Sequence, residues 1–347
     1  MRSKPPRVAA ATWRPAVPGK RCGRYQLLEM LGRGGMADVY LACRHDVDGP
    51  HNRYALKLLQ RKWSMDPQLR SMFASEARLT TELKHPNLVR VFETGEHLGV
   101  PFMVMEYVDG VSCAKILRSV ATRGERFPEG AALVICAEVL KGLMHAHSAT
   151  DRDGKPLGIV HRDVSPGNIL ISRSGRVKLA DFGIARSTQI EHHTDPGQVK
   201  GKFGYMSPEQ VMGDEAVDAR SDIFSLGVVV TEMLLGRRLF SGKGEFEMLT
   251  RMYQADIAVL DHESSRLSPE LLPILKKALQ RDRSQRFANA GEFLAALTRA
   301  ADRMGLELDE PALVPWLFQV GVLPSQSGTY ALQLESRTEQ VEKPGKR

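Results

Sequence analysis

The chain reads HRDVSPGN at residues 161–168 and DFG at residues 181–183. The Pro-Gly pair inside the first motif predicts a tight turn, with Asp163 before it and Asn168 after it. A predicted hairpin separates the motifs, and Asp181 follows its second strand. Two carboxylates and one amide oxygen are therefore expected at one cleft. A small number of such oxygen ligands from the protein suits Mg²⁺, because this ion keeps waters and phosphate oxygens as its other ligands. A structural turn explains any one of these pieces, but hardly the ordered set.

A glycine-rich stretch, LGRGGMADVY, occupies residues 31–40 between two predicted strands. Glycines at positions 32, 34 and 35 let a turn lie close to a polyphosphate, because no Cβ blocks the backbone. A strand follows the stretch, which argues against both a Rossmann turn and a P-loop, since each of those opens a helix. Taken alone, the pattern also fits a glycine hairpin without a ligand.

A lysine lies within an apolar strand, because YALK at residues 54–57 places Lys57 among Tyr, Ala and Leu positions. Burying its charge is costly unless an anion meets the ammonium. Glu76 lies 19 residues further on, in a predicted helix, where its carboxylate could hold the ammonium. A lysine that extends its amine into solvent and an exposed glutamate remain the alternative.

The predicted elements change in character along the chain. Up to residue 106 the apolar runs are short and typical of strands, with one helix that Asp66-Pro67 begins and His85-Pro86 ends. After Gly110 helical periodicity dominates. The strands are expected at 25–31, 36–43, 54–59, 88–96, 102–106, 169–172 and 177–180, and the helices at 112–122, 129–149, 222–235, 244–254, 268–280 and 290–303. This order predicts one α+β bilobal unit.

Composition limits the class of protein. The chain has 347 residues, of which 42% are hydrophobic and 26% charged, which excludes wholesale disorder and a fibrous repeat. Its longest apolar run, residues 226–235, is interrupted by Thr231 and Glu232 and is far shorter than the roughly 18 residues of a bilayer span. No secretory signal is visible. Four cysteines without CxxC spacing predict isolated thiols in a reducing compartment. We therefore expect a soluble, cytoplasmic protein.

The excess positive charge lies at the N-terminus. The formal net charge is +7, and the first 24 residues carry seven Lys or Arg, four Pro and no acid. Residues 1–24 are thus expected as a basic, Pro-rich disordered tail. The tail could meet nucleic acid, anionic lipid or an acidic partner, but a solvated arm is the plainer interpretation. We expect no nucleic-acid binding, because no predicted helix shows a basic face interleaved with aromatics.

Together the motifs resemble those of eukaryotic-like (Hanks-type) serine/threonine protein kinases, of the bacterial kind whose glycine loop reads GxGGMAxVY. The resemblance extends over residues 25–299. It implies a kinase domain at 25–303, with a small β-rich N-lobe (25–106) containing one key helix and a larger, mainly helical C-lobe (110–303). It also implies transfer of the γ-phosphoryl group of Mg-ATP to Ser and Thr hydroxyls of protein substrates. The extension at 304–347 is expected to be mostly disordered, apart from a short helix around 311–320.

The resemblance also implies roles for individual residues. Lys57, paired with Glu76, would hold the α- and β-phosphates. Asn168 and Asp181 would bind Mg²⁺, and Asp163 would accept the proton of the substrate hydroxyl. The expected nucleotide-binding residues lie in the glycine loop (Leu31, Gly32, Arg33, Gly34, Gly35, Met36 and Ala37), around the adenine (Val39, Ala55 and Leu170), at the gatekeeper position (Met105) and in the hinge (Glu106 and Val108).

Two later segments agree with the resemblance. YMSPE at residues 205–209 resembles the family's APE segment, which implies an ion pair between Glu209 and Arg286. Asp222 opens a nearly all-apolar helix that Gly236 ends, and it resembles the aspartate that ties the catalytic loop to the large lobe.

Two positions depart from the family pattern. Ser165 stands where these kinases usually have the lysine that contacts the γ-phosphate, and Lys202 stands where they usually have threonine. Because the two positions lie close together in this fold, we hypothesise that Lys202 supplies the charge missing at position 165. The alternative is a weakened or substrate-altered enzyme with an unrelated surface lysine.

Regulation is expected at the segment between the DFG motif and position 200. Arg162 resembles the arginine that binds a phosphorylated activation loop in relatives. Ser187, Thr188 and Thr194 are the acceptors there, and Thr194 resembles the position that bacterial relatives phosphorylate. Autophosphorylation in a transient homodimer is therefore expected. A pseudokinase scaffold, a small-molecule kinase and a tyrosine kinase are the alternatives, the last disfavoured by Pro166.

Overall fold

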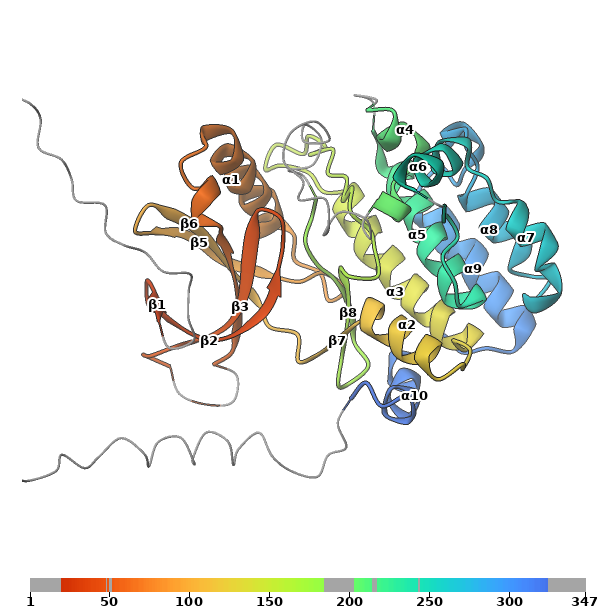
Figure 1. Ribbon diagram of the computed structural model, residues 1–347, viewed down its shortest axis with the longest axis horizontal. Coiled ribbons are helices and arrows are strands. Elements are labelled where there is room, and N and C mark those ends of the chain that lie inside the picture. The colour runs from red at the N-terminus through yellow and green to blue at the C-terminus, as the bar shows by residue number, and fades with distance from the viewer. Residues whose placement is uncertain are drawn as a thin grey trace, which may run out of the picture. The chain divides into compact units, whose positions relative to one another are not determined.

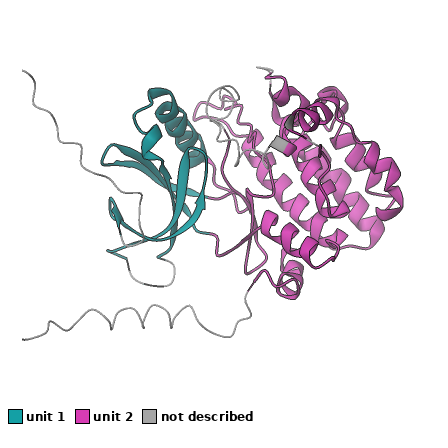
Figure 2. Ribbon diagram, viewed as in Figure 1, with its two compact units in different colours: residues 1–82, 90–107 teal, residues 83–89, 108–347 magenta. Residues whose placement is uncertain are grey.

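A computed structural model gives the structure of residues 20–47, 49, 52–183, 203–213, 217–242 and 244–323. The chain divides into two compact units, coloured separately in Figure 2. Unit 1 comprises Met1–Glu82 and Arg90–Tyr107, and unit 2 comprises Leu83–Val89 and Val108–Arg347. The chain therefore passes between the units three times.

Unit 1 is an antiparallel sheet of six strands in the order β1-β2-β3-β4-β6-β5, with one helix packed against β5 and β6 (Figure 1). Asp66 begins that helix, because its Oδ1 accepts hydrogen bonds from the backbone N–H groups of Gln68 and Leu69. The elements of unit 1 are β1 (Arg21–Cys22), β2 (Tyr25–Arg33), β3 (Ala37–Arg44), β4 (Tyr54–Leu59), the 3₁₀ turn η1 (Arg61–Trp63), α1 (Pro67–Glu82), β5 (Val91–His97) and β6 (Val100–Glu106).

Unit 2 is mainly helical and contains a small antiparallel sheet of three strands, β7-β8-β9. Its helices are α2 (Cys113–Thr122), α3 (Glu129–His147), α4 (Pro208–Val211), α5 (Ala219–Leu235), α6 (Glu245–Gln254), α7 (Ala258–His262), α8 (Leu272–Ala278), α9 (Ala290–Met304) and α10 (Leu313–Gln319). Its strands are β7 (Gly110–Ser112), β8 (Ile169–Ser172) and β9 (Val177–Leu179), and its 3₁₀ turns are η3 (Phe203–Tyr205), η4 (Ser264–Arg266), η5 (Arg283–Gln285) and η6 (Glu310–Ala312).

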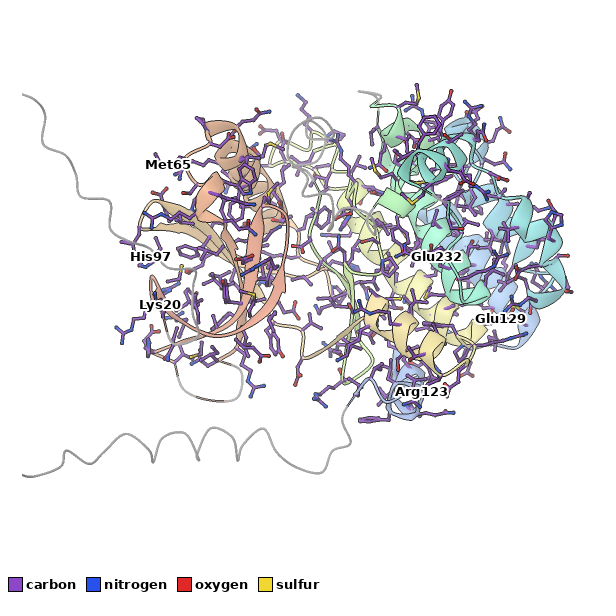
Figure 3. All side chains as sticks on the ribbon, in the orientation of Figure 1. Lys20, Met65, His97, Arg123, Glu129 and Glu232 are labelled. Atoms are coloured by element: carbon purple, nitrogen blue, oxygen red, sulfur yellow. The ribbon has the colours of Figure 1, made fainter. Side chains whose placement is uncertain are left out.

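Helix α5 forms the centre of unit 2. Every residue from Ser221 to Leu235 is buried, and α3, α8 and α9 pack around the helix. Glu232, labelled on α5 in Figure 3, is buried with the rest. The helix begins after Asp218, whose side chain accepts a hydrogen bond from the Arg220 amide, and it ends at Gly236 in the left-handed region (φ 69°). A helix buried all round explains its nearly all-apolar sequence.

The sequence predicted every long element of this fold, with the starts of three elements shifted by three or four residues. The helix expected from residue 222 begins earlier, at Ala219, after its N-cap Asp218. The strand expected from residue 88 begins at Val91, because the preceding residues pair in unit 2, where the Val89 amide donates to the Leu179 carbonyl at 2.9 Å. The helix expected from residue 268 begins at Leu272, next to Pro273 in its first turn. Among the described helices, none has the length and apolar character needed to cross a membrane.

The described part of the C-terminal extension is ordered against unit 2. The short helix expected around 311–320 is present as α10 (Leu313–Gln319). Leu313 and Leu317 are buried, and Trp316 packs on Phe127 with ring centroids 4.5 Å apart. The Glu310 carboxylate accepts a hydrogen bond from the Val177 amide at the start of β9.

Candidate active site

Unit 1 holds the predicted lysine–glutamate pair. Lys57 Nζ donates a hydrogen bond to Glu76 Oε1 at 2.6 Å, and the two side chains are only 11% and 5% exposed. Lys57 is on the central strand β4, and Glu76 is on the face of α1 that packs toward the sheet. Pairing with a carboxylate offsets the desolvation of the buried ammonium, so the expected ion pair is confirmed.

The strand register places the expected adenine and gatekeeper residues together within unit 1. Ala55 lies directly opposite Met105 of β6, and Lys57 lies opposite Val39 of β3. Ala55 and Lys57 are two residues apart, so their side chains emerge on the same face of β4. The hinge position Glu106 ends β6, and the chain enters unit 2 at Val108.

The glycine loop connects β2 and β3. The Gly34 amide donates to the Ala37 carbonyl at 2.8 Å, which closes a tight turn. A Cβ at position 34 would lie 2.9 Å from that carbonyl oxygen, so the turn accepts only glycine there. Leu31, Gly32, Arg33 and Gly35 are exposed, Met36 is half-buried and Ala37 is buried.

In unit 2, a buried carboxylate accepts hydrogen bonds from the backbone of the catalytic-loop motif and holds it in place. Asp222, at the start of α5, accepts hydrogen bonds from the backbone amides of His161 and Arg162, both at 2.8 Å. His147 Nε2 lies 2.8 Å from the same carboxylate. Burial raises the pKa of Asp222, but the hydrogen bond with His147 and that from the His161 amide outweigh burial and lower it. The expected tie between α5 and the catalytic loop is confirmed.

The ring of His161 links the catalytic loop to the DFG motif. Its Nδ1 accepts the Asp163 amide at 3.2 Å, so its Nε2 carries the proton that it donates to the Ala180 carbonyl at 3.1 Å. Burial lowers the pKa of this imidazole, although the neighbouring carboxylates oppose the shift. The same ring packs on Phe182 with centroids 4.5 Å apart. A neutral histidine thus fixes the residue before Asp181.

The side chains of Asp163 and Asn168 are hydrogen-bonded to each other, and backbone hydrogen bonds fix the residues around Asp181. Asn168 Nδ2 donates to the carbonyl and to Oδ2 of Asp163, at 2.8 and 2.9 Å. The Ala180 amide donates to the Asn168 carbonyl at 2.8 Å, and the Gly183 amide donates to the His161 carbonyl at 2.8 Å. These bonds lie on both sides of Asp181. The structure therefore brings the backbone segments that carry Asp163, Asn168 and Asp181 together.

The backbone is strained on both sides of this unit. Arg162 and Asp181 adopt positive φ values of 64° and 54°, which are uncommon for residues other than glycine. A Cβ at Gly183 would lie 2.9 Å from the Asp163 Cβ, so glycine lets the DFG backbone approach the catalytic loop. Such strain is typical of functional sites, where surrounding hydrogen bonds maintain it. Leu170 follows on β8, opposite Ser112 of β7.

A buried ion pair fixes the segment that carries Glu209. Arg286 donates from Nη1 and Nη2 to the two carboxylate oxygens of Glu209, at 2.7 and 2.8 Å, which confirms the expected pair. Burial raises the pKa of Glu209, but the arginine and the Ser221 hydroxyl lower it overall. Arg286 also donates to three backbone carbonyls, those of Arg220, Gln280 and Arg281.

Sequence reasoning missed Gln210. Its Nε2 donates to the Arg162 carbonyl at 2.9 Å, and its Oε1 accepts from the Ser207 amide at 3.0 Å. This glutamine therefore connects α4 directly to the strained residue of the catalytic loop. Only its place beside Glu209 could have suggested the contact.

The two departures from the family pattern differ in what the structure describes. Ser165 is 3% exposed, and its hydroxyl has no hydrogen-bond partner within the described residues. Lys202 lies outside the described residues, as do Ser187, Thr188 and Thr194. The hypothesis that Lys202 compensates for Ser165 therefore stays a prediction.

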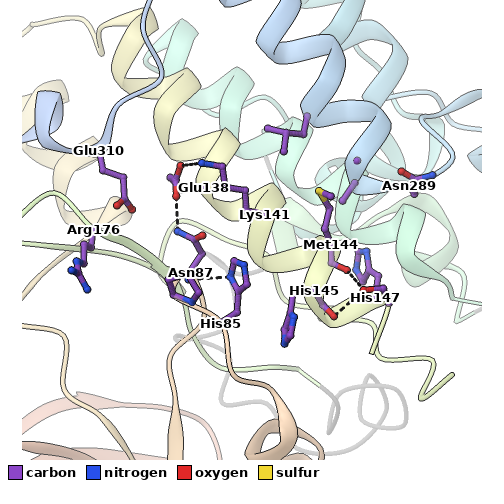
Figure 4. A pocket seen from close by; sticks show the side chains of 15 residues that line it. His85, Asn87, Glu138, Lys141, Met144, His145, His147, Arg176, Asn289 and Glu310 are labelled. Carbon is purple, nitrogen blue, oxygen red and sulfur yellow. Dashed lines mark hydrogen bonds and ion pairs between the residues drawn. The ribbon is translucent and has the colours of Figure 1, made fainter. Parts of the chain in front are cut away.

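A cavity of about 950 Å³ lies elsewhere in unit 2 (Figure 4). It is lined by parts of the 85–87 loop, α3, α9 and the extension, and by none of the predicted site residues. Asn87 donates to Glu138 at 2.7 Å, and Glu138 pairs with Lys141. The cavity does not coincide with the candidate site, and we assign the chemistry to the motifs instead.

Comparison with known proteins identifies the class. The family model described as "Protein kinase domain" matches residues 25–296, so the chain belongs to the protein kinase family. The expected α+β bilobal kinase fold is confirmed by the solved kinase domain of PknI from Mycobacterium tuberculosis. That structure is 26% identical, covers 83% of this chain and 100% of its own, and has a TM-score of 0.60.

The particular relatives are bacterial. The chain is 37% identical to the serine/threonine-protein kinase PknB of Mycobacterium tuberculosis, over 82% of this chain and 44% of the relative. It is 34% identical to the serine/threonine-protein kinase PrkC of Bacillus subtilis, over 82% of this chain and 42% of the relative. A third relative, named tyrosine-protein kinase MasK, from Myxococcus xanthus, is 36% identical over 79% of this chain and 42% of the relative. The chain thus spans less than half the length of these relatives.

Proposed function

We propose that this chain is a protein serine/threonine kinase, which transfers the γ-phosphoryl group of Mg-ATP to Ser and Thr hydroxyls of protein substrates. The observation that carries the proposal is the coexistence of two buried constellations. Unit 1 has the Lys57–Glu76 pair, and unit 2 has Asp163 and Asn168 in one hydrogen-bonded unit. A scaffold that only binds a partner would not need either.

Members of this family use ATP and a divalent metal ion, and the residues present fit Mg²⁺. Both N–H groups of the Asn168 amide are used by Asp163, which turns its Oδ1 away from Asp163 and leaves that oxygen as the ligand. Asp181 would supply the carboxylate. Within the described residues no group of three His, Cys, Asp or Glu could hold a metal. Two protein oxygens suit Mg²⁺, which neutralises phosphate charge when bound.

The remaining roles follow from the same geometry. Lys57 would bind the α- and β-phosphates as a cation that Glu76 holds in place. Asp163 would accept the proton of the attacking hydroxyl, with one carboxylate oxygen oriented by Asn168. Val39, Ala55, Leu170 and the glycine-loop and hinge residues named above would contact the nucleotide. Positioning and charge stabilisation then supply most of the rate enhancement, since phosphoryl transfer needs little covalent chemistry from the protein.

The partners and setting are part of the proposal. We propose autophosphorylation at Thr194 in a transient homodimer, and Arg162 is the arginine that would bind the product phosphate. All four cysteines are free, which fits a cytoplasmic location. We propose a kinase domain over residues 25–303, preceded by a basic segment, residues 1–24, that has no nucleic-acid partner. Arg21–Cys22 of this segment, expected in the disordered tail, instead pair with β2 as strand β1.

Intact-mass analysis after incubation with Mg-ATP tests the activity. Mass should increase in steps of one phosphate in the wild-type chain, and should not increase in Asp163→Asn or Lys57→Met. Phosphopeptide mapping should place one phosphate on Thr194. Absence of added mass and of transfer to generic protein substrates, with ADP still bound, would instead indicate a pseudokinase scaffold.

Tyrosine phosphorylation is a second candidate, because the relative MasK is named a tyrosine-protein kinase. Pro166 in the catalytic loop and the names of PknB and PrkC favour serine and threonine. Phosphoamino-acid analysis of the labelled chain separates the two. We expect phosphothreonine and phosphoserine, and phosphotyrosine alone would assign the chain to the other specificity.

A further inference from the structure

Three consecutive carbonyl groups of the glycine loop accept hydrogen bonds from one short segment of unit 1. Gln60 Nε2 donates to the Gly34 carbonyl at 2.8 Å, and Trp63 Nε1 donates to the Gly35 carbonyl at 3.0 Å. The backbone amide of Gln60 donates to the Met36 carbonyl at 2.7 Å. Gln60 directly follows β4, and Trp63 ends η1. We refer to the side chains of Gln60 and Trp63 as the loop clamp.

The loop clamp determines where the loop's amides point. In a trans peptide the carbonyl oxygen and the following N–H lie on opposite sides of the chain, and no peptide bond in the described chain is cis. Holding the carbonyls of Gly34 and Gly35 on the clamp side therefore turns the amides of Gly35 and Met36 to the other side. Within the described residues these two amides have no hydrogen-bond acceptor. No atom of the described residues lies within 4 Å of a Cβ built at Gly35, so the space beside the loop at this position is open within the described chain.

Neighbouring contacts fix the loop clamp itself. Gln60 Nε2 also donates to Asp38 Oδ1 at 3.0 Å, just after the loop. Lys62 Nζ lies 4.8 Å from the centre of the Trp63 ring. Arg70 of α1 donates to the Ser64 carbonyl at 3.0 Å, which ties the segment to the helix that carries Glu76. The clamp is thus fixed to both β3 and α1.

We propose that Gln60 and Trp63 are positioning residues that aim the amides of Gly35 and Met36 at the polyphosphate of the bound nucleotide. The inference rests on the proposed function, because that function identifies the ligand as a nucleotide polyphosphate. Two adjacent unpaired N–H groups that point the same way form an anion-binding concavity. A loop without the clamp would have to order itself on binding, at a cost in affinity for the phosphates alone.

The test compares binding of ADP and adenosine by calorimetry, in the presence of Mg²⁺. Trp63→Phe removes the indole N–H and keeps an aromatic ring, and Gln60→Met removes the amide donor at similar length. Each substitution should weaken ADP binding about 3- to 10-fold, which is the effect of one lost hydrogen bond, and should leave adenosine binding within about twofold. In transfer assays KM for ATP should rise with little change in KM for the protein substrate.

Trp316→Phe is the matched control, because it makes the same chemical change in α10 of unit 2. It should leave the ratio of ADP to adenosine affinity unchanged. Equal weakening of ADP and adenosine by either clamp variant would show a merely structural role and overturn the proposal, as would no effect on either ligand. If Trp63→Phe does not fold, Gln60→Met alone decides the question.

Binding does not require phosphoryl transfer, so the two proposals fail separately. A wild-type chain that binds ADP but never transfers phosphate would overturn the proposed function, while the affinity ratio would still support or contradict the clamp. A wild-type chain that transfers phosphate, with clamp variants that bind ADP normally, would overturn the clamp and leave the function standing.

Discussion

Lys57 Nζ and Glu76 Oε1 lie 2.6 Å apart in a pair that is almost closed to solvent. Removing one partner of such a pair leaves an uncompensated buried charge. We therefore expect Glu76→Gln to lower the free energy of unfolding by about 3–5 kcal/mol. Phosphoryl transfer should fall by roughly two to three orders of magnitude, the usual effect of losing one preorganised electrostatic contact. Denaturant unfolding and single-turnover transfer measure the two effects.

The double variant Lys57→Met with Glu76→Leu separates stability from chemistry. Replacing a buried ion pair by apolar groups of similar volume is often neutral or stabilising. The free energy of unfolding of the double variant should therefore be close to the wild-type value. Transfer should stay as low as in Lys57→Met alone. A double variant as unstable as Glu76→Gln would show that the pair is not the source of the loss.

Arg286 makes two hydrogen bonds to Glu209 and three to backbone carbonyls from a fully buried position. Lysine has one donor centre and cannot reproduce this planar arrangement. Arg286→Lys should therefore cost about 2–4 kcal/mol of stability, close to the range for breaking a buried pair. Arg283→Lys, a change at a partly exposed arginine nearby, is the matched control. Equal effects of the two substitutions in urea unfolding would contradict the assignment.

His161 should make stability depend on pH near neutrality. Its pKa in the folded state is lowered by burial, so between that value and the usual value of about 6.5 the unfolded chain binds more protons. The contribution of His161 to the free energy of unfolding is complete above about pH 6.5. It is lost as the pH falls below that value, with a slope of up to about 1.4 kcal/mol per pH unit. Melting temperatures between pH 5 and 8 should show this fall, and His161→Asn should reduce the slope.

Other titrating groups shape the same curve. Burial raises the pKa values of Glu232 and Glu310, which opposes the His161 slope at the acidic end of this window. Asp222 and Glu209 have lowered pKa values, so their protonation weakens the fold only at more acidic pH. The pKa of His85 is also lowered by burial, so part of the slope should survive in His161→Asn. A slope identical to that of the wild type would show that His161 is not the buried neutral group described above.

Much of the fold and the centre of the site could be predicted from the sequence because each depends on local patterns. Lys57, Asp163 and Asn168 lie in short motifs whose spacing fixes their elements, and the apolar run after Asp222 indicated a buried helix. The contacts of Gln60, Gln210 and His147 could not be predicted in this way. Each joins segments far apart in the chain through one side chain, and nothing in the local sequence marks the partner.

Residues 305–323 should stabilise the hairpin between Asn168 and Asp181. A chain that ends at Met304 loses the burial of Leu313 and Leu317 and the hydrogen bond from Val177 to Glu310. Two buried leucines alone correspond to about 3–6 kcal/mol. We expect a lower melting temperature and weaker transfer, and a chain that ends at Leu323 is the matched control. Equal stability of the two chains would contradict this role.

The Ser165 hydroxyl should lower stability, because it is buried and has no partner within the described residues. Ser165→Ala should raise the free energy of unfolding by about 1 kcal/mol, since it removes an unsatisfied polar group. An equal or lower unfolding free energy would show that the hydroxyl is bonded in solution.

Phosphoryl transfer by variants at positions 202 and 165 tests the predicted role of Lys202. If Lys202 supplies the cation for the γ-phosphate, Lys202→Ala should lower phosphoryl transfer by at least about 100-fold while ATP binding changes much less. Ser165→Lys in the Lys202→Ala background should then restore part of the rate, because the charge returns at the position where the family usually has it. Single-turnover kinetics with separately measured ATP affinity make the comparison. Unchanged turnover in Lys202→Ala would rule out the compensation.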